Sequence, residues 1–548
     1  MRLPDQIASA DALRSALISL GIEVCDIQER VFPGEKIYIV FVNDSYFDRA
    51  IQEANRLDER IEDGFITVKK SASSQQLERV SVSSVQDERI TQLIELLNSR
   101  SRTSEQLPAL RYVKDAEENL AITLSPRHHL IFGRRGVGKS ALMVEARSLL
   151  QRKGALTTWM NFQPLRGLSS SRAFLTLLLR LCDLPRIQHQ NRLRTPLSEV
   201  HASTLRERIQ NTLAGAADVD LVAQGLVGDA QYMLRLLTDE VAQDLYLFFD
   251  DVHYMPSAEL PVLLDMIHGL TRDNRVWIKA AGIKHQMRWF VDNPPTGLQT
   301  GHDATIINLD VTLENPRNAR FFLSNIFQTY VEELRIKSIS RVISASAIDR
   351  LVLASGGVPR DFLILSAAAM ASTRARQGGR TAGVQDVNAV AGEAANLKLQ
   401  ELEEDAAASR GGARQRIDTL GRIRNFLIST RQITFFQIDF LDKERHPAEY
   451  DLVQGLMDLR MIHLLHASLS DRHEAGKRAE VYLIDLSQYS GSRFKQKLTV
   501  LDLESGTLVM RKTRTTELPR RGQVARDINA ILRLGPVFDL SALSDLVG

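Results

Sequence analysis

The sequence is poor in cysteine, in long apolar runs and in charge of one sign. Its 548 residues include only two cysteines, Cys25 and Cys182, which are too few for a disulfide framework and favour a reducing compartment. No apolar run approaches the ~18 residues of a spanning helix, so we expect no membrane segment. The opening MRLPDQIASAD lacks the apolar core of a secretory signal. We therefore expect a cytoplasmic protein.

The charge balance does not indicate a protein that is basic throughout and binds nucleic acid over its whole surface. The spacing of the histidines does not indicate a metal centre. Lys and Arg number 69 against 67 Asp and Glu, so the net charge is +2. Any nucleic-acid contact must therefore come from a local patch. The histidines and cysteines lack zinc-ligand spacing, and no G-x-S-x-G element supports serine hydrolase chemistry. Hydrophobic residues make up 44% and charged residues 25% of the chain, as in ordinary globular proteins.

Strand-like and helix-like segments alternate through the middle of the chain, which predicts an α/β protein with a parallel sheet covered on both faces. A small α+β module is expected before it and a winged-helix pattern after it. The predicted divisions are a small module (1–70), a Ser/Gln-rich linker with a helix (71–104), the core (105–330), a helical lid (331–402), a winged-helix domain (412–490) and a basic C-terminal extension (491–548).

The strongest motif is GRRGVGKS at residues 133–140, which matches G-x-x-x-x-G-K-[ST]. The apolar run HHLIF precedes it and a helical pattern follows, as a phosphate-binding loop requires. Glycines let the backbone wrap around phosphates, and the amides of residues 135–140 would face them at a helix N-terminus. The predicted nucleotide contacts are Gly133, Arg135, Gly136, Val137, Gly138, Lys139, Ser140 and Ala141. Lys139 would reach the β- and γ-phosphates of ATP, and the Ser140 hydroxyl would bind Mg²⁺.

A second motif, LYLFFDD at residues 245–251, ends a buried strand with two carboxylates. Ligands of open α/β sheets bind at the carboxyl ends of the strands, so these acids are expected beside the loop. Asp250 would hold Mg²⁺ through water, and Asp251 would polarise the attacking water. A strand without catalytic function, followed by a helix N-cap, would have the same residue pattern. The preceding phosphate loop favours the catalytic interpretation.

Together these motifs resemble Walker A and Walker B of a P-loop ATPase of the AAA+/STAND class. RVWIKAAGIK (275–284) is similar to the sensor 1 strand of that class, and SGGVPRDFL (355–363) to the lid turn of origin-recognition-type initiators. The resemblance implies an AAA+-like core, a helical lid and a winged helix. It also implies that Arg360 senses the γ-phosphate, although a salt bridge at a helix start is the alternative.

Several residues depart from this family's pattern. The sensor 1 strand lacks a polar Asn or Thr, and Lys279 or Lys284 could contact the γ-phosphate or be solvated. The second acid is Asp251 rather than Glu, so we expect slow, switch-like hydrolysis. No arginine finger is assigned among Arg272, Arg275 and Arg288.

Some positively charged and aromatic side chains near the loop have more than one interpretation. Arg134 and Arg135 could add charge near the nucleotide, face acidic partners or be solvated. For His128 and His129, which lie in the strand before the loop, we expect one to point inward and to be satisfied in the core.

The C-terminal third carries a local excess of positive charge. The proposed wing holds Arg472, His473, Lys477 and Arg478, diluted by two acids. Nine basic residues stand against three acids between positions 493 and 526: Arg493, Lys495, Lys497, Arg511, Lys512, Arg514, Arg520, Arg521 and Arg526. The patch predicts salt-dependent contact with double-stranded DNA, but a protein-docking winged helix or a solvated face fits as well.

We thus expect an ATP- and Mg²⁺-dependent ATPase switch that couples nucleotide state to assembly on DNA, as a homo-oligomer, or to a partner. The alternative is a STAND-like signalling or antiviral-defence scaffold that docks an effector protein without binding DNA. A nucleotide kinase fits less well, because kinases do not need the lid and the winged helix.

Overall fold

The structure, a computed structural model, describes residues 9–32, 35–42, 46–58, 61, 64–70, 80–99, 112–113, 118–188, 195–216, 218–407, 412–471, 474, 476–490, 498–512 and 528–547. The chain divides into two compact units, Met1–Ser81 with Arg335–Lys337, and Val82–Leu334 with Ser338–Gly548. No helix in the described part of the chain combines the length and apolarity needed to cross a membrane.

The first unit is a small α+β module, as expected. Its elements are α1 (Ala10–Ser19), β1 (Val24–Phe32), β2 (Glu35–Val42), α2 (Phe47–Leu57) and β3 (Gly64–Lys70). The sheet order is β1-β2-β3, with β1 antiparallel and β3 parallel to β2. Leu13 and Leu17 of α1 and Ala54 of α2 pack against Tyr38 and Val40 of β2 in one core.

The second unit is built on a five-stranded parallel sheet of order β10-β4-β7-β6-β5. Its strands are β4 (His128–Phe132), β5 (Leu156–Asn161), β6 (Leu245–Asp250), β7 (Val276–Gly282) and β10 (Ala304–Asn308). A short hairpin, β8 (Phe290–Asp292) with β9 (Pro295–Gly297), lies between β7 and β10 in sequence. The strand order places β7 between β4 and β6, so the expected sensor strand lies between the two phosphate-site strands.

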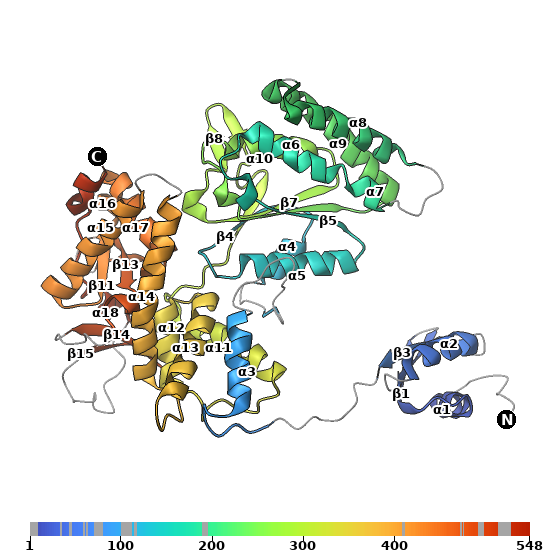
Figure 1. The fold of residues 1–548 in the computed structure, drawn as a ribbon, viewed down its shortest axis with the longest axis horizontal. Coiled ribbons are helices and arrows are strands. Elements are labelled where there is room, and N and C mark those ends of the chain that lie inside the picture. The colour runs from blue at the N-terminus through green and yellow to red at the C-terminus, as the bar shows by residue number, and fades with distance from the viewer. Residues whose placement is uncertain are drawn as a thin grey trace. The chain divides into compact units, whose positions relative to one another are not determined.

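Helices cover both faces of this sheet (Figure 1). They are α4 (Asn119–Leu124), α5 (Lys139–Arg152), α6 (Ser170–Leu181), α7 (Leu184–Gln188), α8 (Leu197–Asn211), α9 (Val219–Val241) and α10 (Leu260–Thr271). Phe248 of β6 belongs to the apolar cluster with Leu142 of α5, whereas Leu247 and Phe249 belong to the cluster with α6, α9 and α10. Alternate residues of one strand thus enter opposite cores, which confirms the predicted doubly covered α/β sheet.

A helical lid follows β10. It consists of α11 (Pro316–Glu333), α12 (Ala345–Ser355), α13 (Pro359–Ala375) and α14 (Val384–Ala407). The earlier helix α3 (Glu88–Ser99) packs on α13, and the Arg374 guanidinium donates to the Asp87 carbonyl at 3.3 Å. The predicted linker and helix therefore contribute one helix to the lid.

A winged-helix domain follows the lid, as expected. It contains α15 (Gly412–Arg424), β11 (Phe435–Asp439), α16 (Phe440–Arg445), α17 (Pro447–Asp458), β12 (Ile462–Ser470) and β13 (Arg478–Ile484), with sheet order β11-β13-β12. The wing lies between β12 and β13; Arg472 and His473 fall outside the described residues.

The described part of the basic extension packs on the winged helix and, through β14 and β15, on α12 and α11 of the lid. It forms β14 (Thr499–Glu504), β15 (Thr507–Lys512) and α18 (Ile528–Leu532). Residues 536–538 pair with β11, since the Gln437 amide donates to the Pro536 carbonyl at 2.9 Å and the Phe538 amide to the Gln437 carbonyl at 2.8 Å. Phe538 is buried against Phe436.

Candidate functional site

The GRRGVGKS segment forms the loop between β4 and α5. Gly136 and Gly138 have φ angles of +83° and +109°, which L side chains rarely adopt. A Cβ at Gly133 would lie 2.6 Å from Val137 Cγ2, and one at Gly136 would lie 2.8 Å from Arg360 Cβ. The loop therefore requires glycine at these positions. It ends at the N-terminus of α5, where backbone amides and the helix dipole favour an anion.

Lys139 is the first residue of α5 and only 7% exposed. Its Nζ donates to the Gly133 carbonyl at 2.7 Å and to the Arg134 carbonyl at 3.1 Å. Burial lowers the pKa of this amine, while Asp251, Asp310 and Asp250 oppose the shift. A phosphate group bound in the loop would add a further stabilising negative charge.

Ser140 and Asp250 meet at the carboxyl end of the sheet. The Ser140 Oγ donates to Asp250 Oδ2 at 2.7 Å, although 110 residues separate the two in sequence. Burial first and Asp251 second raise the pKa of Asp250 to about 6, against the opposing effects of Ser140 and Lys139. A hydroxyl and a carboxylate side by side fit Mg²⁺, which takes oxygen ligands and commonly uses one or two protein groups with water and substrate phosphates. No cluster of three or more His, Cys, Asp or Glu suited to a metal occurs among the described residues.

The pKa of Asp250 makes the stability of the metal-free protein depend on pH. Because the folded-state pKa is raised, stability from this group is fully present below about pH 4 and is lost as the pH rises through about 6. Between about pH 4.5 and about pH 7.5, the wild type should lose about 2 kcal/mol of unfolding free energy relative to Asp250→Asn. Denaturant unfolding of both proteins in EDTA measures this difference. Parallel pH profiles would contradict the assigned environment of Asp250.

Asp251 has a φ angle of +56°, a left-handed backbone that residues other than glycine adopt rarely, with asparagine and aspartate among the more frequent exceptions. Its amide donates to Asp250 Oδ1 at 3.0 Å, and its side chain is 34% exposed. The two neighbouring acids therefore differ in environment: Asp250 is buried against Ser140, whereas the Asp251 carboxylate is accessible.

His253 follows these acids and belongs to neither sequence motif. Its side chain is 4% exposed, and its Nδ1 lies 4.0 Å from Asp251 Oδ1. Neither ring nitrogen has a hydrogen-bond partner among the described residues. The ring stacks on Tyr254 at 4.7 Å. Burial, followed by Lys139, Arg135 and His285, lowers the pKa of His253 to about 3.

The lid turn lies directly on the phosphate loop. The Arg360 amide donates to the Gly136 carbonyl at 3.3 Å, which places the predicted sensor arginine beside the loop. Its position at the start of α13 also fits the alternative of a helix-start contact.

Arg134 connects the loop to the lid. It is 3% exposed. Its Nε donates to Asp310 Oδ1 at 3.0 Å, and its Nη2 donates to the Val311 and Gly356 carbonyls, each at 3.1 Å. Arg134 is therefore not solvated, and the acidic group that it contacts, Asp310, lies in the same chain. Arg135 is partly exposed.

The expectation for Lys279 was wrong in both forms, because this lysine is neither solvated nor at the phosphate end. It is fully buried. Its Nζ donates to the carbonyls of Ser125 at 2.8 Å and Arg127 at 2.9 Å, and it lies 2.7 Å from His129 Nδ1. Burial lowers the pKa of Lys279 to about 6. Lys284 lies just after β7 and is exposed.

Both His128 and His129 are buried, rather than one of them, because both faces of β4 are covered. His128 Nδ1 accepts from the Ile278 amide at 3.0 Å, so it is a satisfied core group as expected. Of the three finger candidates, Arg275 pairs with Asp244 at 2.7 Å and Arg272 precedes it in the same turn. That turn lies at the amino ends of the strands, away from the loop. Arg288 follows β7 and is exposed.

The winged helix contacts both the lid turn and the segment after β7. Arg460 pairs with Asp361 at 2.6 Å, and both side chains are less than 10% exposed. A side chain at Gly356 would overlap His463. Asp458 at the end of α17 is 2% exposed; it pairs with His285 and accepts from Gln286 Nε2 at 2.8 Å.

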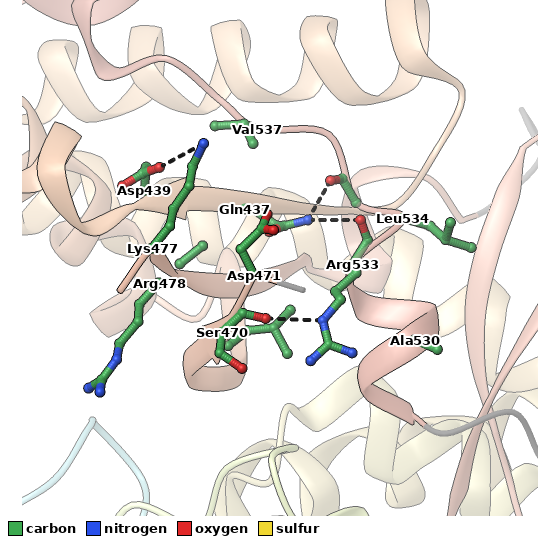
Figure 2. A pocket seen from close by; sticks show the side chains of 13 residues that line it. Gln437, Asp439, Ser470, Asp471, Lys477, Arg478, Ala530, Arg533, Leu534 and Val537 are labelled. Atoms are coloured by element: carbon green, nitrogen blue, oxygen red, sulfur yellow. Dashed lines mark hydrogen bonds and ion pairs between the residues drawn. The ribbon is translucent and has the colours of Figure 1, made fainter. Parts of the chain in front are cut away.

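A separate cavity of about 410 Å³ lies between the wing hairpin and α18 (Figure 2). Its charged lining residues are Asp439, Asp471, Lys477, Arg478 and Arg533. Lys477 pairs with Glu474 at 2.9 Å, and the Arg533 Nε donates to the Ser470 carbonyl at 3.0 Å. Arg478 is exposed at the start of β13.

Residues 119–278 match the AAA ATPase domain family, which confirms the predicted P-loop ATPase of the AAA+ class for this part of the chain. No curated protein matches the sequence significantly. Among solved structures, the Aeropyrum pernix ORC1 protein in complex with DNA is similar at 13% identity, over 75% of this chain and 92% of that one, with a TM-score of 0.31. A RuvB variant from Thermotoga maritima is similar at 13% identity, over 54% and 76%, with a TM-score of 0.28.

Proposed function

We propose that this protein is a Mg²⁺-dependent ATPase switch whose nucleotide state is transmitted to the lid and the winged helix. The observation that carries the proposal is the phosphate loop with the Ser140–Asp250 pair at its edge, 2.7 Å apart. A loop that needs glycine at Gly136 and Gly138 and ends at a helix N-terminus suits phosphates. A hydroxyl and a carboxylate beside it suit the Mg²⁺ that accompanies them.

Each residue of the site has one role in this proposal. The backbone of residues 133–141 surrounds the phosphates, and Lys139 leaves the Gly133 carbonyl to contact the β- and γ-phosphates. Ser140 and Asp250 hold Mg²⁺, which supplies charge neutralisation. Asp251 polarises the water that attacks the γ-phosphorus while the bond to the β–γ bridging oxygen breaks, giving ADP and phosphate. Arg360, adjacent to Gly136, senses the γ-phosphate. Because aspartate reaches less far than glutamate, turnover is slow.

The contacts of the lid explain how nucleotide state would reach the rest of the unit. Arg134 ties the loop to Gly356, and the Arg360 amide ties the lid to Gly136. The next lid residue, Asp361, forms a buried pair with Arg460 of the winged helix. A shift of the lid turn caused by the γ-phosphate would therefore displace a buried ion pair, which is costly to break. Such a coupling makes two discrete arrangements of lid and winged helix more stable than intermediate ones.

The proposed readout is assembly on double-stranded DNA. Arg478 and Arg533 both line the cavity beside the wing (Figure 2), so they offer two guanidinium groups to phosphates on one side of the winged helix. Arg520, Arg521 and the rest of the predicted basic patch between 513 and 527 lie outside the described residues. Arg511 lies within them and pairs with Glu504 at 3.0 Å, so its charge is partly neutralised.

If DNA binds here, Arg478→Ala with Arg533→Ala should weaken binding mainly at low salt. Removing two phosphate contacts should reduce the slope of log affinity against log salt by about 2. Fluorescence anisotropy with a labelled duplex at several salt concentrations measures this slope. Arg208→Ala, which removes an exposed arginine from α8, is the matched control and should leave the slope unchanged. A loss of affinity that does not depend on salt would contradict a backbone contact.

One observation favours the alternative of a STAND-like scaffold that docks an effector protein. The helix that a winged helix would use against DNA, α17, is engaged inside this chain. Asp458 at its end contacts His285 and Gln286 beside the nucleotide site. A winged helix used in this way docks protein. In this function, bound nucleotide stabilises the contact between the winged helix and the ATPase core, and the nucleotide is hydrolysed very slowly.

The two functions are separated by measuring ATP turnover with and without double-stranded DNA, together with the mass of the protein in solution with ATP. Turnover stimulated by DNA and an ATP-dependent rise in mass support the DNA-assembling ATPase. Slow turnover that DNA does not change, with constant mass, supports the scaffold.

A further inference from the structure

We propose that His253 is a positioning residue that orients the Asp251 carboxylate for activation of the attacking water. This inference rests on the proposed ATPase function and adds to it a residue that neither sequence motif contains. His253 lies in the short turn Val252–Tyr254 directly after the two acids.

The geometry places His253 against the candidate general base. Its Nδ1 lies 4.0 Å from Asp251 Oδ1, so a small rotation of the Asp251 side chain would bring the two atoms into hydrogen-bond distance. Catalytic hydrogen bonds are often long before the substrate complex forms. The Asp251 side chain is 34% exposed, so burial alone does not fix the orientation of its carboxylate. A donor from the following turn would hold the carboxylate.

The packing around His253 does not explain why a histidine is buried at this position, whereas a role in orienting Asp251 does. Its side chain is 4% exposed, and neither ring nitrogen has a hydrogen-bond partner within the described ranges. A buried polar group without a partner costs stability. His128, by contrast, is buried in the same domain and accepts from the Ile278 amide. Stacking on Tyr254 accounts for the aromatic ring, but phenylalanine would stack equally well without the polar cost.

The surroundings of His253 suit a neutral imidazole. The positively charged groups Lys139 and Arg135 of the phosphate loop and the ring of His285 all disfavour its protonation, and burial disfavours it most. Asp251 is the negatively charged group that lies closest in the described contacts. A neutral imidazole offers one N–H donor and one acceptor. The donor can hold Asp251 while the carboxylate keeps its charge and remains the base.

Substituting His253→Phe tests the proposal, because the variant keeps the ring on Tyr254 and removes both nitrogens. We expect turnover to fall about 10- to 100-fold, while the dissociation constant for ATP stays within about twofold. The thermal midpoint of the nucleotide-free protein should stay the same or rise by about 2–4 °C, since an unpartnered polar group is replaced by an apolar one of similar shape. His253→Gln, which keeps a donor and an acceptor, should recover part of the turnover.

A second readout does not depend on turnover. The affinity for ADP with aluminium fluoride, a mimic of the transferring phosphoryl group, should fall by a factor similar to turnover, whereas the affinity for ADP alone should not. His201→Phe is the matched control, because His201 also packs on a tyrosine, Tyr232 at 5.1 Å, but lies in α8. It should leave turnover unchanged.

The outcomes distinguish this inference from the function on which it rests. A wild type that hydrolyses ATP no faster than Lys139→Ala overturns both. A wild type with site-dependent turnover and a His253→Phe variant that matches it overturns the role of His253 alone. Turnover, ATP affinity and thermal midpoint that all fall together in His253→Phe would show a structural role and overturn the positioning role.

Discussion

Lys139→Ala is expected to weaken ATP binding by about 100-fold or more. The lysine lies 93% buried at the start of α5, where charge-assisted contacts with phosphates are worth more than in water. Its amine now donates to two loop carbonyls, so it is already held within the loop that would surround the phosphates. Calorimetry or a fluorescent ATP analogue measures the affinity.

Two controls make this result specific. Lys153→Ala removes an exposed lysine at the far end of α5 from the phosphate loop and should leave affinity within about twofold, as expected of surface substitutions. Because the Lys139 amine also bridges Gly133 and Arg134, thermal unfolding of Lys139→Ala must show that the protein remains folded. A folded Lys139→Ala protein with wild-type affinity would contradict the placement of the phosphates in this loop.

Asp251→Asn is expected to lower turnover by about 100- to 10,000-fold, the usual contribution of a general base, and to leave ATP affinity nearly unchanged. Asparagine has the same shape and accepts a left-handed backbone, so the φ of +56° can be retained. It cannot take a proton from water. Phosphate release and nucleotide affinity, measured on the same preparation, separate the two effects.

A different pattern in Asp251→Asn would revise the roles of the two acids. Loss of ATP and Mg²⁺ binding together with turnover would mean that Asp251, rather than Asp250, is the main metal ligand. Unchanged turnover would remove Asp251 from the catalytic step. The environments favour the present assignment, since Asp250 accepts from Ser140 and the Asp251 side chain is the more exposed of the two.

The phosphate loop could be predicted from sequence because its requirements are local. A strand, glycines with left-handed backbone and a helix N-terminus all lie within residues 128–152. The Walker B strand could be predicted for the same reason, as a continuous apolar run ending in acids. In the first unit, the apolar run KIYIVFVND gives a clear strand signal for β2. Its neighbour β1, VCDIQERVF, gives a weak one, because charged and polar residues interrupt its apolar pattern.

The remaining features depend on contacts between distant parts of the chain. Arg134 meets Asp310 and Gly356, 176 and 222 residues away, and no spacing rule links these positions. Lys279 was expected to be solvated or near phosphate, but its strand packs beside β4, where carbonyls before that strand surround the amine. The sequence shows His253 only as a polar residue shortly after an apolar strand. Its burial depends on contacts between distant parts of the chain, which no local pattern indicates.

The most direct test of the central claim is phosphate release from ATP by the purified wild-type protein, measured with Mg²⁺, again in excess EDTA, and beside Lys139→Ala. We expect release by the wild type that depends on Mg²⁺ and falls to background in the variant. Equal release by wild type and variant, or release that EDTA leaves unchanged, would contradict an ATPase built on the phosphate loop and Asp250.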